Sequence, residues 1–575
     1  MVGRAFHRAR KHLGGIQRAA YARITAPVVG LHQAAYLLAG LTLASQVLAL
    51  LRDRTFAHAF GAGQVLDLYY AAFRVPDLVF AVVSSLVSAY VLIPYIAKMN
   101  REETQKLLSE TSTFLLAGGG FICFVLAIYM PQFLTWLYPT LMHSGAAAEF
   151  VLLGRMLLIQ PILLGLSGVL SSVTQVHRRF VLFALSPVLY NLGIIVGSVF
   201  LYPVWGLSGL GMGVILGAVA YLAVNIPVLV ESGVMPSFAM PSWRTMLPIV
   251  HNSIPRSLAL GMNSITALFL TAIASGMGAG AVSVFTFANN LQAVPLALIG
   301  SSYAVAAFPA LSEAHAREEH SEFTRILSAS ARHIVLWSML AFGLIVVLRA
   351  HLVRVILGTG AFDWNATRTT AALLAVLTIG LAADALELLF NRALYAARQS
   401  WRPLMYQVAA GAVTVVLFYY LDQLPPSTLL LPLAAYLKVS DVHELRIILV
   451  ALASALGQLF LVGLSLIALR RVAPGLSRSL AVPLRDGTAS AIVGGCVAYG
   501  VLALLGELVP LTTLTTVFFD GFAAGLAGLV AAGIVLYILN NPEFSMVLSV
   551  VARFVKAPAE SSEALQPSGE EPIQP

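Results

Sequence analysis

Residues 447–469 read IILVALASALGQLFLVGLSLIAL and contain no charged side chain. A helix needs about 20 mostly apolar residues to cross the hydrocarbon core of a bilayer. Hydrocarbon offers no partner to backbone N–H and C=O groups, so a spanning segment must satisfy them within a helix or a closed barrel. The strands of a membrane barrel are only about 10 residues long and alternate in polarity. The stretch therefore predicts a membrane-spanning helix.

Apolar stretches of this kind recur along the whole chain. Of the 575 residues, 59% are hydrophobic and 10% are charged, with a mean hydropathy of +0.86. A soluble domain carries about 25% charged residues, so most of this surface cannot face water. The sequence predicts an all-α polytopic membrane protein with about 14 transmembrane helices. We place the spans at residues 28–51, 67–97, 112–129, 148–175, 181–203, 206–230, 246–275, 281–310, 334–357, 369–395, 403–421, 447–469, 488–506 and 514–540.

Basic residues indicate how these helices are oriented. The net charge is +8, but the Lys and Arg residues lie mainly in short loops between apolar stretches. That distribution is typical of membrane topology and argues against a nucleic-acid partner. An even number of spans places both termini on one side, and the positive-inside rule makes that side the cytoplasm. The basic inner loops are then residues 98–106, 177–179, 317–332, 398–402 and 470–485.

The sequence also predicts the structure of three segments outside the spans. Residues 1–27 carry several Arg and Lys residues without the compact apolar core of a signal peptide. We predict that they form a basic amphipathic cytoplasmic segment on the anionic leaflet. Residues 556–575 are rich in Pro, Ser and Glu, which predicts a disordered tail. In the outer loop 422–446, the apolar run 429–437 is too short to span and predicts an interfacial or re-entrant segment.

Two basic turns suggest that the chain repeats a unit of about six helices. Span four ends at His177–Phe180, and span ten ends similarly at Arg398–Pro403. Repeated halves are typical of transporters, although basic inner turns also occur in any polytopic protein. We expect an N-lobe at 28–230, a C-lobe at 246–469 and two further helices at 488–540.

Polar side chains inside the spans are the candidates for a functional site, because each is costly in hydrocarbon and tends to line a cavity. They recur in the first two helices of each expected lobe, and those of span two fall roughly along one helical face. This pattern predicts a hydrated central cavity. The charged or amide residues are Gln46 and Arg52 in span one, Asp67, Arg74 and Asp77 in span two, Arg256 in span seven and Asn290 in span eight.

The charged residues also have plainer interpretations. Arg52 can sit at the outer interface with its charge in water, and Arg74 can be neutralised by Asp67 or Asp77. Arg256 lies about ten residues into span seven, which is too deep for an interfacial residue.

A second charged group lies in span ten. Asp384 and Glu387 are candidates to bind a coupling cation or proton, or to pair with Arg392 on the same helix. Arg392 lies near the inner end of this span, where the positive-inside rule also explains it.

The sequence contains no convincing catalytic motif. The sequence has no Walker motif, and His315 and His320 are one residue too far apart for the inverted zincin motif. The glycines within 206–217 lie in an apolar helix, where small residues allow close helix packing. Cys123 and Cys496 lie far apart in predicted spans and are interpreted as packing residues. We expect no enzymatic activity, no metal and no cofactor.

Several short segments, in collinear order between about residues 30 and 470, resemble one family. They are Ser45–Asp53, Phe60–Gly63, Ala72–Pro76, Gln175–Phe180, Gly206–Gly217, Gly360–Asp363 and Arg392–Ala396. In these segments the sequence resembles the MurJ/MviN family of lipid II flippases, within the MOP exporter superfamily.

The resemblance implies two six-helix lobes in a V shape, alternating access to a cationic cavity, and two C-terminal helices beside a groove for a lipid tail. It implies a monomer of the bacterial inner membrane that moves lipid II, a polyprenyl pyrophosphate-linked peptidoglycan precursor, to the outer leaflet. Membrane lipids and cell-wall synthases are the further partners it suggests. The membrane potential or a monovalent ion is the implied driving force. Arg52, Asp67 and Arg74 match the family and are expected to bind the substrate.

The sequence departs from the family pattern where the family carries charged cavity residues. The replacing residues are Gln46, Phe80, Ala81, Ser85, Asn290 and Ala293. We still expect Gln46 and Asn290 to line the substrate path, and we hypothesise that Arg256 supplies the missing anion contact. Three alternatives stay open: a flippase for another polyprenyl-linked glycan, a cation-coupled exporter of small molecules, and a scaffold for cell-wall enzymes.

Overall fold

The structure, a computed structural model, describes residues 31–87, 89–442, 445–508 and 513–556. These residues form helices and connecting loops, with no strand among them. The all-α fold is therefore confirmed. The predicted N-terminal segment 1–27 lies outside the described residues, as does the predicted tail beyond Lys556.

Twelve helices among the described residues are long and apolar enough to cross a membrane, and they correspond to the third to fourteenth predicted spans. The first two predicted spans coincide with α2 (Leu31–Phe60) and with the run α3 (Gln64–Val79), η1 (Phe80–Ser84) and α4 (Ala89–Ile96). Neither is among the twelve, so the total of fourteen stays a prediction.

The remaining helices follow in chain order. The first group is α5 (Arg101–Phe114), η2 (Leu115–Gly119), α6 (Gly120–Leu137), α7 (Pro139–Met142), α8 (Ala147–Leu157), α9 (Ile159–Val176), α10 (Phe180–Val196), η3 (Gly197–Leu201), α11 (Tyr202–Trp205), α12 (Leu207–Ala223) and α13 (Ile226–Ser232). The second is α14 (Trp243–Ser275), α15 (Ala281–Leu296), η4 (Ala297–Ser301), α16 (Ser302–Ala316), α17 (His320–Ile356), α18 (Trp364–Leu377), η5 (Thr378–Gly380), α19 (Leu381–Ala396), α20 (Trp401–Gln423), α21 (Leu430–Leu437) and α22 (Ile447–Leu469). The last is α23 (Leu476–Ser479), α24 (Ala481–Leu508), α25 (Leu514–Ile538) and α26 (Pro542–Lys556).

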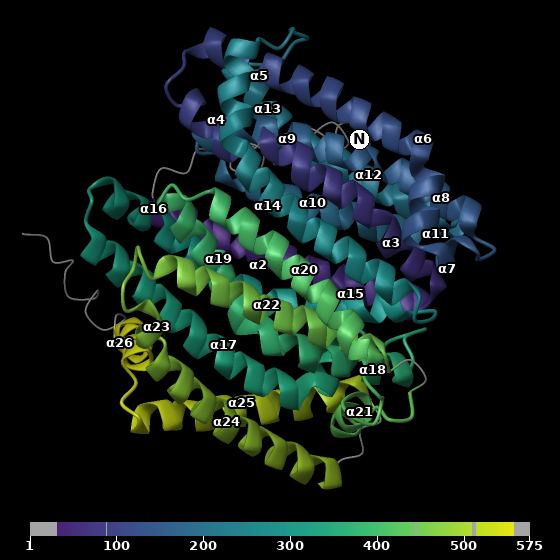
Figure 1. Cartoon of the computed structure of the whole chain (residues 1–575), viewed down its shortest axis with the longest axis vertical. Coiled ribbons are helices and arrows are strands. Elements are labelled where there is room, and N and C mark those ends of the chain that lie inside the picture. Colours follow the sequence, from purple (N-terminus) through teal and green to yellow (C-terminus); the bar gives the residue numbers. More distant parts are fainter. Residues whose placement is uncertain (1–30, 88, 443–444, 509–512, 557–575) are drawn as a thin grey trace, which may run out of the picture.

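The bundle has two main groups of helices. Helices α3–α13 occupy the upper part of Figure 1 and α15–α22 the lower part, with α2 and α14 between them. We call these groups, with α2 and α14 respectively, the N-half and the C-half. They meet where α14 packs on α3 and η1, and where α15 packs on α3 and α2. Helices α24 and α25 pack on each other and on α17, at the far side of the C-half. The predicted lobe boundaries stay a prediction.

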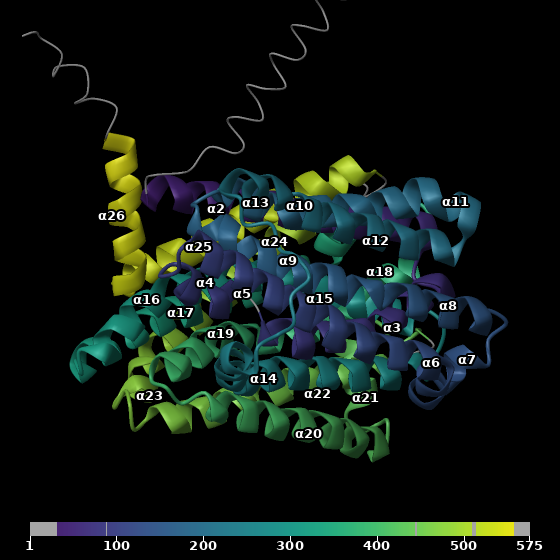
Figure 2. The same cartoon turned by 90° about the horizontal axis from the view of Figure 1, so that it is seen from above.

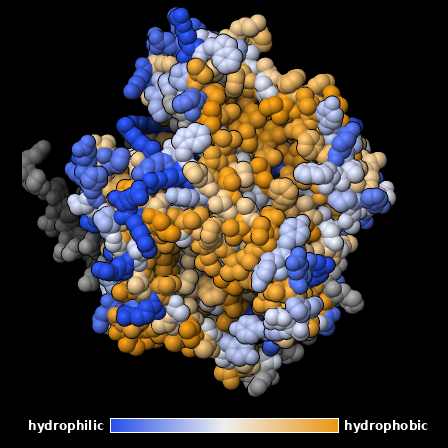
Figure 3. All heavy atoms as spheres, viewed as in Figure 1, coloured by the Kyte–Doolittle hydropathy of each residue, from blue (hydrophilic) through white to orange (hydrophobic). Residues whose placement is uncertain are grey.

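Hydrophobic residues form a broad surface across the face in Figure 3, and hydrophilic residues gather toward its edges. Large apolar side chains such as Phe121, Trp136 and Phe200 are exposed by 66–69%. Their exposure is expected of a surface whose solvent is lipid.

Matching distortions occur at equivalent places in the two halves. Helices α3 and α15 each contain 16 residues and an internal proline, and each continues into a five-residue π-helix, η1 or η4. The turns after α9 and α19 also match, because Arg178 and Arg398 both adopt a positive φ of 56°. These shared features support the internal repeat that the two basic turns suggest.

The outer loop between α20 and α22 contains the short helix α21. Ala434 and Leu437 of α21 are buried, so this apolar run packs against the protein. Arg368 of α18 reaches Asp441 at 2.7 Å between Nη1 and Oδ2. This hydrogen bond holds the pKa of the Asp441 carboxyl below its ordinary value.

In the N-half, glycines allow the backbones of α10 and α12 to approach each other closely. A Cβ on Gly193 would lie 2.4 Å from the Gly217 backbone, and one on Gly213 would lie 2.4 Å from the Cα of Gly197. The predicted role of the glycines in close packing is therefore confirmed.

Gly213→Ala should destabilise the protein by about 1–3 kcal/mol, because the added methyl group forces the two backbones apart. Thermal unfolding of the purified protein in detergent measures the effect as a lower Tm. Gly168→Ala is the matched control, since a Cβ there meets nothing within 4 Å. The close-packing interpretation is wrong if both variants unfold at the same temperature.

Candidate functional site

The centre of the molecule holds a buried cluster around Arg52, on α2. Its Nε and Nη2 donate to Asp53 Oδ1 at 3.0 and 2.8 Å, and its Nη1 donates to Asn191 Oδ1 at 3.1 Å. The other carboxylate oxygen, Asp53 Oδ2, accepts a hydrogen bond from Asn290 Nδ2 at 2.9 Å. Asp53 is 2% exposed. Since Asn290 lies on α15, this cluster joins the two halves.

Arg74 forms a second polar contact between the halves. Its Nε donates to Thr271 Oγ1, on α14, at 2.8 Å. Tyr70, one turn earlier on α3, is buried and lies within electrostatic range of both Arg52 and Arg74.

Asp67 has a different environment from the one expected for a substrate contact. It is fully buried at the start of α3 and accepts hydrogen bonds at the N-terminus of α15. Its oxygens accept from the Gly280 backbone N at 2.5 Å and from the Ser283 backbone N and Oγ at 2.8 and 2.5 Å. A carboxylate in this position satisfies N–H groups that the helix leaves unpaired and interacts favourably with the helix dipole. Asp67 thus ties the predicted outer ends of the two halves together.

Two further contacts close the same end. Arg54 Nη1 donates to the Val355 carbonyl at 2.6 Å, which satisfies a carbonyl group at the end of α17. The backbone N of Ala361 donates to the His58 carbonyl at 3.0 Å. The halves also approach closely at Gly280, whose φ is 92° and where a Cβ would lie 2.5 Å from the Ala62 carbonyl oxygen.

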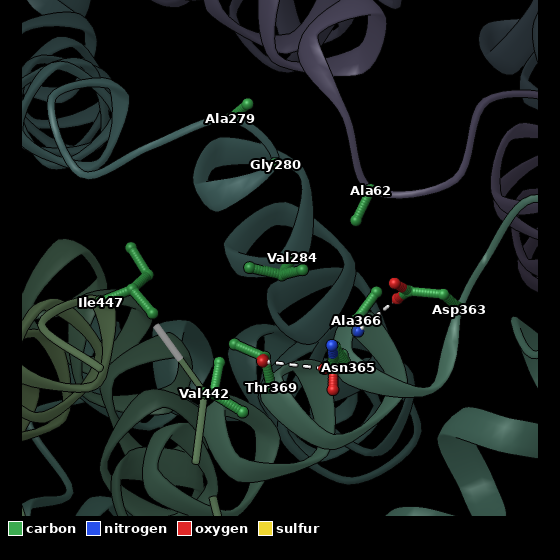
Figure 4. Close-up of a pocket in the computed structure, with 10 residues that line it drawn as sticks. All are labelled: Ala62, Ala279, Gly280, Val284, Asp363, Asn365, Ala366, Thr369, Val442 and Ile447. Carbon is green, nitrogen blue, oxygen red and sulfur yellow. Dashed lines mark hydrogen bonds between the residues drawn. The ribbon is translucent and has the colours of Figure 1, made fainter. Parts of the chain in front are cut away.

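A small pocket lies beside this closed end. It has a volume of about 200 Å³ and is lined by the loop at Ala62, the start of α15 and the start of α18 (Figure 4). Asp363 caps α18 there, since its Oδ1 accepts from the Ala366 backbone N at 2.7 Å. This cap stays within the C-half, whereas the Asp67 cap crosses between the halves.

Arg256 belongs to a separate region of α14. It is half-buried and acts electrostatically on Tyr395, at the inner end of α19. Tyr395 lines an inner pocket of about 710 Å³ together with His315, His320 and Arg398. Arg256 thus acts on a residue of this pocket, although it is not one of the residues that line it.

Asp384 lies in a polar pocket inside the C-half. Its Oδ2 accepts a hydrogen bond from Gln292 Nε2 at 3.0 Å, and the pocket has a volume of about 220 Å³. The other polar lining residues are Asn263, Asn289, Ser454 and Gln458. These side chains offer carboxylate, amide and hydroxyl oxygens, which are the ligands that hard cations prefer.

Glu387 lies one turn further along α19 and accepts a hydrogen bond from Ser465 Oγ at 3.1 Å. Arg392 is on the same helix, closer to its inner end. Among the described residues there is no group of three or more His, Cys, Asp or Glu side chains placed to hold a metal ion.

The sequence-predicted residues thus fall into four places. Arg52, Asn290 and Arg74 lie at the central interface, and Gln46 lies six residues before Arg52 on α2. Asp67 lies at the outer contact, Arg256 lies on α14 and acts on Tyr395, and Asp384, Glu387 and Arg392 lie on α19. Asp53, which connects Arg52 with Asn290, is not among the predicted site residues. Its position directly after Arg52 was the signal in the sequence that could have identified it.

The sequence matches the family described as "Lipid II flippase MurJ" over residues 56–519. It is 26% identical over 399 residues to "Lipid II flippase MurJ" of Burkholderia cenocepacia, a match that covers 67% of this chain and 77% of that protein. It is also 26% identical over 397 residues to "Probable lipid II flippase MurJ" of Rhizobium tropici, covering 66% and 73% of the two chains.

Solved structures show the same fold. The chain superposes on "Lipid II flippase MurJ, inward closed conformation" with a TM-score of 0.69 and 17% identity, over 88% of this chain and 100% of that one. An inward-facing MATE family multidrug resistance transporter of the MOP superfamily gives a TM-score of 0.61 and 16% identity, over 76% of this chain and 96% of that one.

Asp67→Ala should open the outer contact, because it removes charge-assisted hydrogen bonds worth about 1.5–3 kcal/mol each. We would measure the labelling of a cysteine at Val284, which is buried beside the outer pocket, by a membrane-impermeant maleimide in a Cys123→Ala, Cys496→Ala background. The labelling rate should rise about tenfold or more.

Asp363→Ala is the matched control for this experiment. It also removes a helix-capping carboxylate, but one whose partner lies in the same half. Equal labelling of the Val284 cysteine in the two variants would contradict an inter-half role for Asp67.

Proposed function

The chain belongs to the MurJ family of lipid II flippases, and we propose that it moves lipid II from the inner to the outer leaflet by alternating access between its two halves. The observation that carries this proposal is the pair of arginines, Arg52 and Arg74, at the interface between the two halves. Cations at membrane depth are expensive and mark substrate pathways.

The chemistry of the central cluster suits a pyrophosphate. Guanidinium groups bind phosphate oxygens through paired, charge-assisted hydrogen bonds. Arg52 is matched by Asp53 and Asn191, and Arg74 donates to Thr271. An arriving pyrophosphate would compete with these partners. Because Asn290 and Thr271 belong to the C-half, their release would loosen the contact between the halves.

The closed outer end and the inner pocket give the proposed direction of entry. Asp67, Arg54 and the Ala361–His58 contact hold the outer end shut. On the inner side, the large pocket is lined by His315, His320 and Arg398, which can bind an anion, and also by the acidic Glu318. We infer that the headgroup enters past this pocket and Arg256, and that release to the outer leaflet requires the Asp67 contact to break.

The lipid tail has a candidate path of its own. A groove of about 430 Å³ lies between α17 and α25 and is almost entirely apolar, with Leu352, Phe518 and Phe522 among its lining residues. A polyprenyl chain can stay in such a groove while only the headgroup crosses the bilayer.

We assign the coupling role to the Asp384 pocket. Its oxygen-rich lining suits a proton or a small monovalent ion, with Glu387 and Arg392 nearby on α19. Gln292 contacts Asp384, and Asn290, two residues earlier on α15, contacts Asp53. The two sites are therefore linked through one helix.

The remaining assignments follow from family membership and the loop charges. The chain is a multi-pass membrane protein of a bacterial family. We propose that it resides in the inner membrane as a monomer with both termini in the cytoplasm, transports without catalysis, and has membrane lipids and cell-wall synthases as its other partners.

Arg52→Gln and Arg74→Gln should each lower lipid II flipping at least about tenfold, since loss of one charge-assisted contact costs about 1.5–3 kcal/mol and each 1.36 kcal/mol is tenfold in rate. The assay uses the full chain in vesicles with labelled lipid II in one leaflet. Arg368→Gln is the control, because its partner Asp441 lies in the outer loop. Unchanged flipping in both central variants would refute the proposed site.

The same vesicles separate the leading function from the next candidate. Replacement of charged family residues by neutral ones in the cavity, such as Gln46 and Asn290, favours a different polyprenyl pyrophosphate-linked glycan as the second candidate. Transport of such a glycan by the unaltered protein, without transport of lipid II, would establish that alternative.

Asp384→Asn should make flipping insensitive to the gradient that drives it, because the amide keeps the shape of the carboxyl but carries no charge. The measurement is the initial flipping rate with an imposed Na⁺ gradient, and separately with a pH gradient. Asp520→Asn, at another buried carboxyl on α25, should keep the dependence of the unaltered protein. Retention of the gradient effect in Asp384→Asn would place coupling elsewhere.

A further inference from the structure

Helix α26 follows the last span and takes a different direction from it. The chain turns at Asn540, which has a positive φ of 50°, and α26 then runs across the direction of the long helices (Figure 2). Figure 1 shows the same helix nearly end-on, at the end of the bundle where α16, α17 and α23 meet their loops. The family match ends at residue 519, so α26 lies beyond it.

The first turn of α26 is fixed to the bundle by buried polar contacts. Asn541 caps the helix, since its Oδ1 accepts from the Phe544 backbone N at 3.0 Å, and its Nδ2 donates to Asp486 Oδ2 at 2.9 Å. Glu543 accepts from Arg332 Nε, on α17, at 2.7 Å, and its side chain is only 4% exposed. These contacts hold α26 to both α24 and α17.

The rest of the described helix has an apolar face and a polar face. Phe544, Val547 and Leu548 are spaced by three or four residues and fall on one side, while Ser545 and Ser549 fall on another. The Phe544 ring lies against Gly533 of α25, so the apolar side is the one turned toward the ends of the spans. Leu548 is nevertheless 42% exposed and Ser549 is exposed.

This geometry matches a helix in the plane of a membrane surface. A helix that crosses the direction of the spans, located at their ends, runs along the bilayer surface. The side that faces the ends of the spans also faces the hydrocarbon beside the bundle. Loop charges identify this end as the cytoplasmic one. The sequence 542–556 also contains two basic residues, Arg553 and Lys556, and basic residues in the sequence of a cytoplasmic interfacial helix favour anionic lipid.

We propose that α26 is an interfacial helix that lies in the inner leaflet at the boundary between headgroups and acyl chains, and that it prefers anionic phospholipid. Its buried first turn connects this attachment to α17 and α24. The membrane attachment itself does not depend on which lipid the protein transports.

The test is the depth of spin labels on α26 in the full chain, reconstituted in vesicles of phosphatidylethanolamine and phosphatidylglycerol. Single cysteines replace Val547 and Leu548 on the apolar face, and Ser545 and Ser549 on the polar face, in the Cys123→Ala, Cys496→Ala background. Labels at Val547 and Leu548 should collide mainly with lipid-soluble oxygen. Those at Ser545 and Ser549 should collide mainly with a water-soluble nickel chelate.

Two outcomes would overturn the proposal. Equal access of the chelate to all four labels would show a helix in water, and shielding of all four from both reagents would show a helix docked on protein. In phosphatidylcholine vesicles the difference between the faces should shrink, and an unchanged difference would refute the anionic preference.

A separate variant tests the attachment of the first turn. Glu543→Gln should increase the mobility of the Leu548 label, because it weakens the attachment to Arg332. Glu322→Gln, at an exposed pair with Arg325, should leave that mobility unchanged.

Discussion

A charge buried in hydrocarbon has to be matched by a partner, and this requirement accounts for most of the specific contacts at the centre of the molecule. Arg52 is matched by Asp53, Arg54 by carbonyls at the end of α17, and Arg74 by a threonine of α14. Apolar contacts alone are less selective for one helix arrangement than these polar contacts, because lipid tails offer apolar side chains equally good contacts. The polar contacts therefore decide which helices of the two halves face each other.

The same contacts allow the two halves to separate. Each is a discrete hydrogen bond that is either made or broken, so the interface has distinct arrangements rather than a continuous range. The net value of a hydrogen bond that can be exchanged for water is only about 0.5–1.5 kcal/mol. A hydrated cavity would satisfy Asp53 and Asn290 after separation. Asp67 is different, because it is fully buried and serves three donors of α15, and it is therefore the firmest tie between the halves.

The sequence predicts local patterns better than it predicts contacts between distant segments. The spans and the glycine contact of α10 with α12 are predictable, because apolar length and small-residue spacing are properties of short segments. The role of Asp67 is not, since its partner Gly280 is 213 residues away and a cap supplied by another helix leaves no local signature. Helix α26 is not predicted either, although the apolar spacing at Phe544, Val547 and Leu548 was an available signal. Its buried Glu543 comes just before these positions and finds its partner, Arg332, only in the folded bundle.

The repeated architecture carries different chemistry in its two halves. Helices α3 and α15 share their length and the π-helix that follows, yet the central arginines belong to the N-half and the α19 carboxylates to the C-half. The two groups of opposite charge therefore lie on different helices and in different halves. Communication between them then needs an element that touches both. Helix α15 meets this condition, because Asn290 and Gln292 point about 200° apart around the helix axis and contact Asp53 and Asp384 respectively. Under the proposed coupling role, a change in the charge of Asp384 would act on the hydrogen bond at Asp53 through this one helix.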